Sequence, residues 1–277
     1  MSTIAPPTPE NQHIPYFEFE GDETIGPEAY ARCVEERDSP LRKRYAPLFA
    51  GCMAAAEVFG IKPDPQTAET WKRIVAATGP LDKFLDDSPD REEALKLYYQ
   101  GLNYMQGKGD EPELPGWADL GLETTVRLLK NAFVVLPEER RETLLDAGEA
   151  IGKISAKKAA CTDLHEYIDL LCLEGLASGI LITRAVTDEV YTQPSYVLFG
   201  LWFDRAMELA TLLDSARDLE RDSQAGLTGV EFTPDNRRKI IAAAEPSATT
   251  VLHSNFGRKA IWEGVVEGYH FFKGQTT

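Results

Sequence analysis

The chain has 277 residues, of which 43% are hydrophobic and 27% charged, and its formal net charge at pH 7 is −16. This composition supports a buried core and excludes a disordered chain, and no apolar run is long enough for stable membrane insertion. The negative charge makes nucleic acid and anionic membranes unfavourable partners, although cations gathered at one place can still bind an anion. The N-terminus lacks a secretion signal and the four cysteines form no CxxC pair, so we expect a cytoplasmic protein with reduced cysteines and no zinc.

After an N-terminal arm of residues 1–25, almost every segment has the apolar spacing and the terminal residues of an α-helix. In chain order we expect helices from Pro27, from Ser39 to Gly60, from Pro65 to Asp87, from Glu92 to Met105 and from Trp117 to Leu136. One long helical stretch follows from Pro137 to about Val186, then helices from Pro194 to about Gly226, from Pro234 to Ala244 and from about Thr249 to Phe272. No linker separates these segments, so residues 26–277 are predicted to form a single all-α domain.

Late in the long helical stretch, Gly175 and Gly179 are the only helix-breaking residues. Glycine in a helix interior costs about 1 kcal/mol relative to alanine. These positions therefore indicate either close packing against another helix or a kink.

Three carboxylates are spaced four residues apart, at Asp214, Asp218 and Asp222. On an α-helix they would lie on one face over two turns, where like charges repel. A divalent cation such as Mg²⁺, which prefers oxygen ligands, would remove that repulsion. The alternative is a solvated acidic face in an acidic protein.

The same predicted helix has an apolar column upstream, formed by Phe199, Phe203 and Met207 at the same spacing. A carboxylate column that continues into an apolar column suggests a pocket that is charged at its mouth and apolar inside. Packing in the core is the alternative for each of these side chains.

A second acidic cluster, Asp82, Asp86 and Asp87, lies at the C-terminal end of the predicted helix 65–87. The helix dipole is negative at that end, so carboxylates are unfavourable there without cations. Bound metal ions explain both clusters better than helix stability does. The alternative is that these residues simply end the helix in a turn.

The two clusters resemble the metal-binding motifs of class I isoprenoid synthases, in particular those of the squalene and phytoene synthase branch. The first motif of that branch has the form D-x-x-x-D with a further Asp, which Asp82, Asp86 and Asp87 match. The second has the form N-x-x-R-D-x-x-x-D, which the stretch from Asp214 to Asp222 matches with Asp in place of the leading Asn. Further likeness, in Gly179 with Arg184 and in the segment ending at Asp235, extends the resemblance over about residues 67–235.

The resemblance implies a single helical bundle with a central active-site cavity, and a Mg²⁺-dependent enzyme acting on a prenyl diphosphate. It implies two or three Mg²⁺ ions, for which Mn²⁺ can substitute, on Asp82, Asp86, Asp87, Asp214, Asp218 and Asp222. Diphosphate oxygens would be bound by Arg184, Arg217, Arg221 and Lys83. The expected catalytic residues are Asp82, Asp86, Asp218 and Arg184. The wall that would shield a carbocation is expected to include Phe199, Phe203, Met207, Tyr98, Tyr99, Phe133, Tyr167, Gly175 and Gly179.

Three functions remain open. Members of the branch that join two prenyl diphosphates head to head have a Ser-Phe-Ser-like element and an Arg before the first motif. Neither feature is found in this sequence. Before Asp82, the only basic run is Arg42–Arg44. We therefore favour a terpene synthase that ionises and cyclises or rearranges one farnesyl or geranylgeranyl diphosphate, with release of diphosphate. The alternatives are a head-to-head prenyl transferase and a non-catalytic helical binding protein. A homodimer is compatible with all three.

Overall fold

A computed structural model describes residues 90–113, 133–184 and 194–253, with single positions between 56 and 88 and between 126 and 130; at 195, 196, 252 and 253 it describes the backbone only. These ranges contain only helices and connecting turns, with no strand. The prediction of an all-α fold is therefore confirmed for the described part of the chain. Its helices are α4 (Arg91–Met105), α6 (Glu138–Ala160), α7 (Leu164–Thr183), α8 (Pro194–Gln224), α9 (Pro234–Ala243) and α10 (Glu245–His253).

The predicted ends of α4, α8 and α9 are confirmed to within two residues because proline and glycine mark them. Gly107 and Gly226 follow α4 and α8 with positive φ angles of 72° and 70°, which favour glycine. Every described position from 65 to 85 is helical, in agreement with the predicted third helix. The last helix begins earlier than predicted, at Glu245. The predicted arm, the first helix and residues 254–277 lie outside the described residues.

The prediction of one long helical stretch from Pro137 to Val186 is wrong, because two helices occupy it. The chain is extended at Cys161, after α6, and α7 begins after Asp163. The Asp163 carboxylate accepts a hydrogen bond of 2.9 Å from the backbone N–H of Glu166, which is an N-cap. The break contains neither proline nor glycine, and it rests on this cap.

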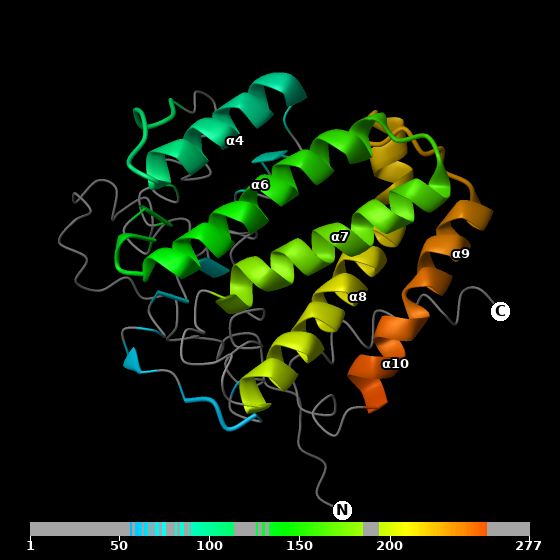
Figure 1. Ribbon diagram of the computed structural model, residues 1–277. Coiled ribbons are helices and arrows are strands. Elements are labelled where there is room, and N and C mark those ends of the chain that lie inside the picture. The colour runs from blue at the N-terminus through cyan, green and yellow to red at the C-terminus, as the bar shows by residue number, and fades with distance from the viewer. Residues whose placement is uncertain are drawn as a thin grey trace, which may run out of the picture.

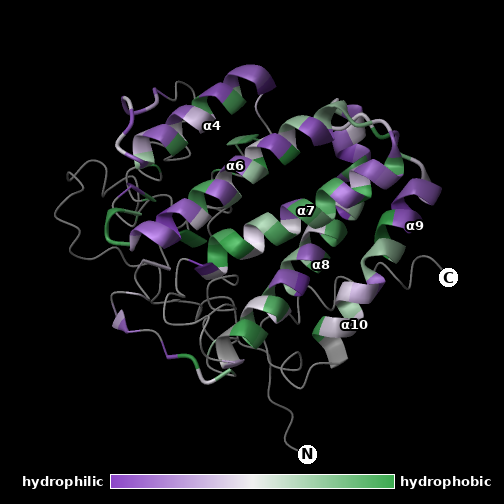
Figure 2. Cartoon of the chain, in the orientation of Figure 1, coloured by the Kyte–Doolittle hydropathy of each residue, from purple (hydrophilic) through white to green (hydrophobic). Residues whose placement is uncertain are grey.

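Helices α4, α6, α7 and α8 lie side by side in that order, and α9 and α10 pack against α8 (Figure 1). Hydrophilic and hydrophobic residues alternate along α4 and α6, as expected for helices with one exposed and one buried face (Figure 2). No helix within the described ranges is long and apolar enough to cross a membrane.

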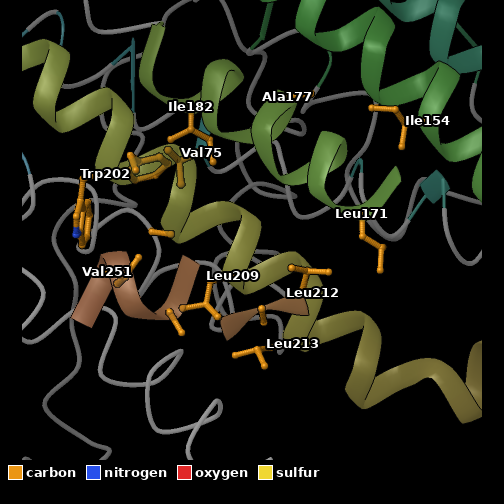
Figure 3. Packing of buried hydrophobic residues seen from close by; sticks show 14 of the residues in the cluster. Val75, Ile154, Leu171, Ala177, Ile182, Trp202, Leu209, Leu212, Leu213 and Val251 are labelled. Atoms are coloured by element: carbon orange, nitrogen blue, oxygen red, sulfur yellow. The ribbon is translucent and has the colours of Figure 1, made fainter. Parts of the chain in front are cut away.

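The main core cluster is built around α8. Leu209 and Leu212 of α8 are fully buried, and they lie among side chains from α7 and from Val251 of α10 (Figure 3). A second, smaller cluster joins α4 to Phe84 and Leu85 of the preceding segment. The core therefore fixes α8 at the centre of the described helices, and α4 on the side of the first acidic cluster.

Gly175 and Gly179 of α7 lie where α7 and α8 are closest. A Cβ atom at Gly175 would lie 2.5 Å from the Cα of Glu208, and one at Gly179 would lie 2.8 Å from Oδ1 of Asp204. Since residue number rises along α7 as it falls along α8, the two helices are antiparallel. Helix α7 continues to Thr183, so these glycines allow close packing and do not mark a kink.

Candidate functional site

The three carboxylates of the second acidic cluster lie on α8 as predicted. The side chains of Asp218 and Asp222 are 16% and 20% exposed, whereas that of Asp214 is 44% exposed. Burial raises the pKa of Asp222, and the neighbouring Arg221 partly offsets this effect. The column therefore runs from an exposed carboxylate to two that are mostly covered.

Two arginines of the same helix pair with the three carboxylates of this column and offset most of their charge. Arg217 donates from Nε and Nη2 to the two oxygens of Asp218, at 2.8 and 2.7 Å, and also pairs with Asp214. Arg221 pairs with Asp222 at 2.8 Å and with Asp218 at 3.3 Å. The hydrogen bonds to Asp218 raise the pKa of Arg217. Repulsion within the column is therefore already reduced by arginine side chains, so it does not by itself require a metal ion.

The donors of this column suit a hard cation, but they do not form a complete site among the described residues. No group of three or more histidine, cysteine or carboxylate side chains is gathered closely enough to hold a metal ion in that part of the chain. Carboxylates four residues apart on a straight helix are about 6 Å apart, so one ion needs ligands from a second segment as well. The predicted source of those ligands, Asp82, Asp86 and Asp87, lies outside the described residues, as does Lys83.

The chain that follows the first cluster is described from Asp90 on, and it lies next to the end of α8. Arg91 begins α4 and donates from Nη1 to the backbone oxygen of Leu227 at 3.0 Å. It also donates from Nη2 to the backbone oxygen and to Oγ of Ser155 in α6, at 3.2 and 3.1 Å. The N–H of Leu227 in turn donates to the backbone oxygen of Asp222 at 2.8 Å. Arg91 therefore joins the segment after the first acidic cluster to the turn that follows the second.

An apolar pocket lies between α4, α6 and the segment that carries the first cluster. Leu81 and Phe84, which lie next to or between the carboxylates of that cluster in the sequence, form part of its wall. Leu102 of α4, Leu144 of α6 and Leu181 of α7 form other parts of the wall. The Tyr98 hydroxyl donates to the backbone oxygen of Gly148 at 2.8 Å, and burial raises the pKa of this phenol, so it stays neutral. The pocket can therefore accept an apolar group.

Of the predicted cavity residues, Tyr98 and Phe133 line this pocket. Phe199 and Phe203 are 1% and 0% exposed and are packed into the main core, where Phe199 lies edge-on to Phe59 and Trp71 at ring distances of 5.6 and 6.3 Å. The other predicted cavity residues are also in contact with protein: Met207 and Tyr167 with the main core cluster, Tyr99 with the second cluster, and Gly175 and Gly179 with α8. Their predicted role in contacting a substrate stays a prediction.

Arg184 is not brought together with Arg217 and Arg221. Its Nη1 lies 2.7 Å from the position that a Cβ of Gly200 would occupy. At about 1.5 Å per residue, Gly200 is about 20 Å along α8 from Asp214. Arg184 therefore belongs to the opposite end of α8, and the predicted clamp of three arginines on one diphosphate is not assembled here.

Asp204, which the sequence analysis missed, faces this same end of α8. It lies one turn after Gly200, with its Oδ1 against Gly179. Among the residues that the structure describes, this buried oxygen has no hydrogen-bond partner. Burial raises the pKa of Asp204 to about 6, although Arg184 and Arg205 act in the opposite direction. The only sequence signal was a carboxylate that directly follows the apolar run Leu201–Phe203 of α8.

A second missed group lies beside the second acidic cluster. Lys158 of α6 and Glu174 of α7 form an ion pair of 2.6 Å, with side chains 12% and 16% exposed. The positive charge of Lys158 acts on Asp222 and lowers its pKa, which opposes the effect of burial. Helix α6 therefore holds the positive charge of Lys158 close to the carboxylates of the second cluster, although Lys158 precedes Asp214 by 56 residues in the chain.

No family model, curated protein or solved structure matched the chain when it was compared with them.

Proposed function

We propose that the protein is a Mg²⁺-dependent class I terpene synthase that ionises one prenyl diphosphate and cyclises or rearranges its hydrocarbon. One observation carries the proposal. The segment that holds the first acidic cluster both walls an apolar pocket, through Leu81 and Phe84, and continues into Arg91, which is bonded to the turn after Asp222. Two carboxylate groups and an apolar pocket are the parts that such a reaction needs.

The residues would act as follows. Asp214, Asp218 and Asp222, with the first cluster, would hold Mg²⁺, which when bound neutralises the charge that develops on the leaving diphosphate. Arg217 and Arg221 would bind diphosphate oxygens, since both are more than 40% exposed and can exchange an Asp partner for phosphate. Lys158 would hold Asp222 in place by its charge. The role of Arg184 as a diphosphate ligand stays a prediction, and it would require Arg184 to move toward the end of α8 that carries the carboxylates.

The hydrocarbon would lie in the pocket between α4 and α6. The residues that line it are almost all aliphatic or aromatic, and the hydroxyl of Tyr98 is occupied by Gly148. Such a wall excludes water and offers no nucleophile to a carbocation. A location along α8, beside Phe199 and Phe203, would require a packed core to open.

Incubation with geranyl, farnesyl and geranylgeranyl diphosphates plus Mg²⁺, followed by mass analysis of the extract, tests the proposal. We expect Mg²⁺-dependent release of diphosphate and a hydrocarbon product from at least one of them. Asp218→Asn should reduce turnover by about 100-fold or more, because Asp218 is central in the column, while helical circular dichroism is retained. Asp146→Asn, at an exposed position of α6, is the matched control and should turn over as the wild type does.

Near-full activity of Asp218→Asn would contradict the assignment of the column. If the wild type forms no product, calorimetry with Mg²⁺ and pyrophosphate decides what remains. The absence of coupled binding would favour the alternative of a non-catalytic helical protein. A product with twice the carbon number of the substrate would favour head-to-head prenyl transfer.

A further inference from the structure

Five large aliphatic side chains are exposed on the outside of the α7–α8 pair. Their exposed fractions range from 40% to 60%, and they are Leu173 and Leu176 of α7 and Val197, Leu198 and Leu201 of α8. We name this set the α7–α8 apolar face. Apolar colour on α7 and at the start of α8 is visible in Figure 2.

These side chains lie on the same side of the helix pair. On α7, Gly175 and Gly179 point at α8, and Leu173 and Leu176 are rotated away from that contact toward solvent. On α8, Gly200 and Asp204 point at α7, and Leu201 is rotated away in the same sense. Because the helices are antiparallel, an equal rotation from the contact line places both groups on one side. The apolar face is therefore shared by the two helices.

The size of this face exceeds what scattered surface residues provide. From their exposed fractions, the five side chains present on the order of 400 Å² of apolar surface, which is the range in which surface patches are often functional. A stable interface needs about 800 Å² from each partner. The face therefore supplies about half of that area, as an apolar centre that polar neighbours would surround.

The charges around the face favour a second copy of this chain as the partner. The protein has a net charge of −16, so two copies repel each other over most of their surface. Near the α7–α8 contact, however, the carboxylates of Asp169, Asp204 and Glu208 are nearly balanced by the guanidinium groups of Arg184 and Arg205. Asp169 and Arg205 are each one helical turn from a residue of the face, Leu173 and Leu201. Arg205 and Glu208 are paired at 2.6 Å. This local balance, together with the absence of a basic rim among these residues, suits an identical face better than an anionic lipid surface.

We propose that the α7–α8 apolar face is the contact surface of a homodimer in which the α7–α8 pairs of two copies pack on each other about a twofold axis. The limited apolar area predicts micromolar affinity. Because repulsion between two acidic chains opposes association, added salt should strengthen the dimer. The dimer is independent of the proposed reaction.

Sedimentation equilibrium of the full chain from about 1 to about 100 µM tests the interface. We expect the wild type to dimerise within this range and Leu201→Glu or Leu176→Glu to raise the dissociation constant by about tenfold or more. Val134→Glu is the matched control, because Val134 is an aliphatic residue with 62% exposure outside the face, and it should dimerise as the wild type does. All three changes are at exposed positions, so the variants should fold.

A wild type that is monomeric throughout this range overturns the proposal. So does a Leu201→Glu variant that associates as tightly as the wild type. Flotation with neutral phosphatidylcholine vesicles tests whether the face binds lipid instead of a second copy. If the monomeric wild type floats with the vesicles and the Leu201→Glu variant does not, the face is a lipid-binding surface and the dimer is contradicted.

Discussion

At the α7–α8 crossing, Asp204 has its Oδ1 in a space that exists only because Gly179 has no side chain. Burial raises the pKa of this carboxyl to about 6, whereas an aspartate in an unfolded chain has a pKa of about 3.9. The folded chain therefore binds more protons than the unfolded chain between these two values. It follows that the stability of the fold decreases as pH rises from about 4 to about 6 and stays reduced above that range.

Asp204→Asn should therefore stabilise the protein at neutral pH, because the neutral amide avoids the cost of a half-buried charge. We expect a gain of about 1 kcal/mol in the free energy of unfolding, a figure discounted because Asp204 is only partly buried and solvent screens its charge. Urea unfolding at about pH 7.5 and about pH 4 measures it, and the gain should disappear at the lower pH. An equal gain at both pH values would show that the amide simply packs better, and would contradict the ionisation argument.

At the scale of helices, residues with fixed backbone preferences made the chain predictable. Pro194 and Gly226 bracket α8, and Pro234 begins α9, so their ends were found from sequence. The break between α6 and α7 was missed because it depends on a single cap at Asp163, and a polar residue there is also compatible with a continuous helix. Local sequence does not show whether a polar residue at such a position caps a new helix or lies within a continuous one.

Gly175 and Gly179 show the opposite case, in which the sequence is compatible with two interpretations and packing decides between them. Gly175→Ala should destabilise the fold by about 2 kcal/mol, because its Cβ would lie 2.5 Å from the backbone of Glu208 and would push α8 away. Gly101→Ala is the matched control, since it is also buried in a helix but its Cβ would have Pro112 at 4.0 Å as its nearest neighbour. It should be neutral or stabilise by up to about 1 kcal/mol through helix propensity. Thermal unfolding of both variants checks the difference, and equal effects would exclude close packing as the reason for Gly175.

For the whole molecule, the sequence located the candidate carboxylates but not their surroundings. A column of apolar residues at helical spacing is compatible with a cavity wall and with a core. Phe199 and Phe203 are in the core because Phe59 and Trp71, more than a hundred residues earlier in the chain, pack near them. The pocket between α4 and α6 also combines residues from Ile74 to Leu181, and no local pattern brings these together. The sequence alone therefore could not predict contacts between side chains that are far apart in the chain and meet only in the folded protein.

For the proposed reaction, the distribution of cations among the described residues predicts how many prenyl diphosphates would bind per chain. Head-to-head synthesis needs two anion sites, each with cations that are not fully committed elsewhere. Within the described residues, Arg91 is engaged by Leu227 and Ser155, Lys158 is paired with Glu174, and Arg184 lies next to Asp204. In the part of the chain that the structure describes, only Arg217 and Arg221 combine more than 40% exposure with a position beside the carboxylate column, where diphosphate oxygens would replace some of their Asp partners.

We therefore expect one molecule of a non-hydrolysable farnesyl thiolodiphosphate to bind per chain in the presence of Mg²⁺. Native mass spectrometry and calorimetry give this ratio directly, and the product should have the same carbon number as the substrate. Replacing both arginines, as Arg217→Gln with Arg221→Gln, should abolish binding of the analogue. The matched double variant Arg238→Gln with Lys239→Gln, which removes two exposed cations from α9, should leave it unchanged. Two analogues bound per chain, with a product of doubled carbon number, would reverse the preference for a terpene synthase over a head-to-head prenyl transferase.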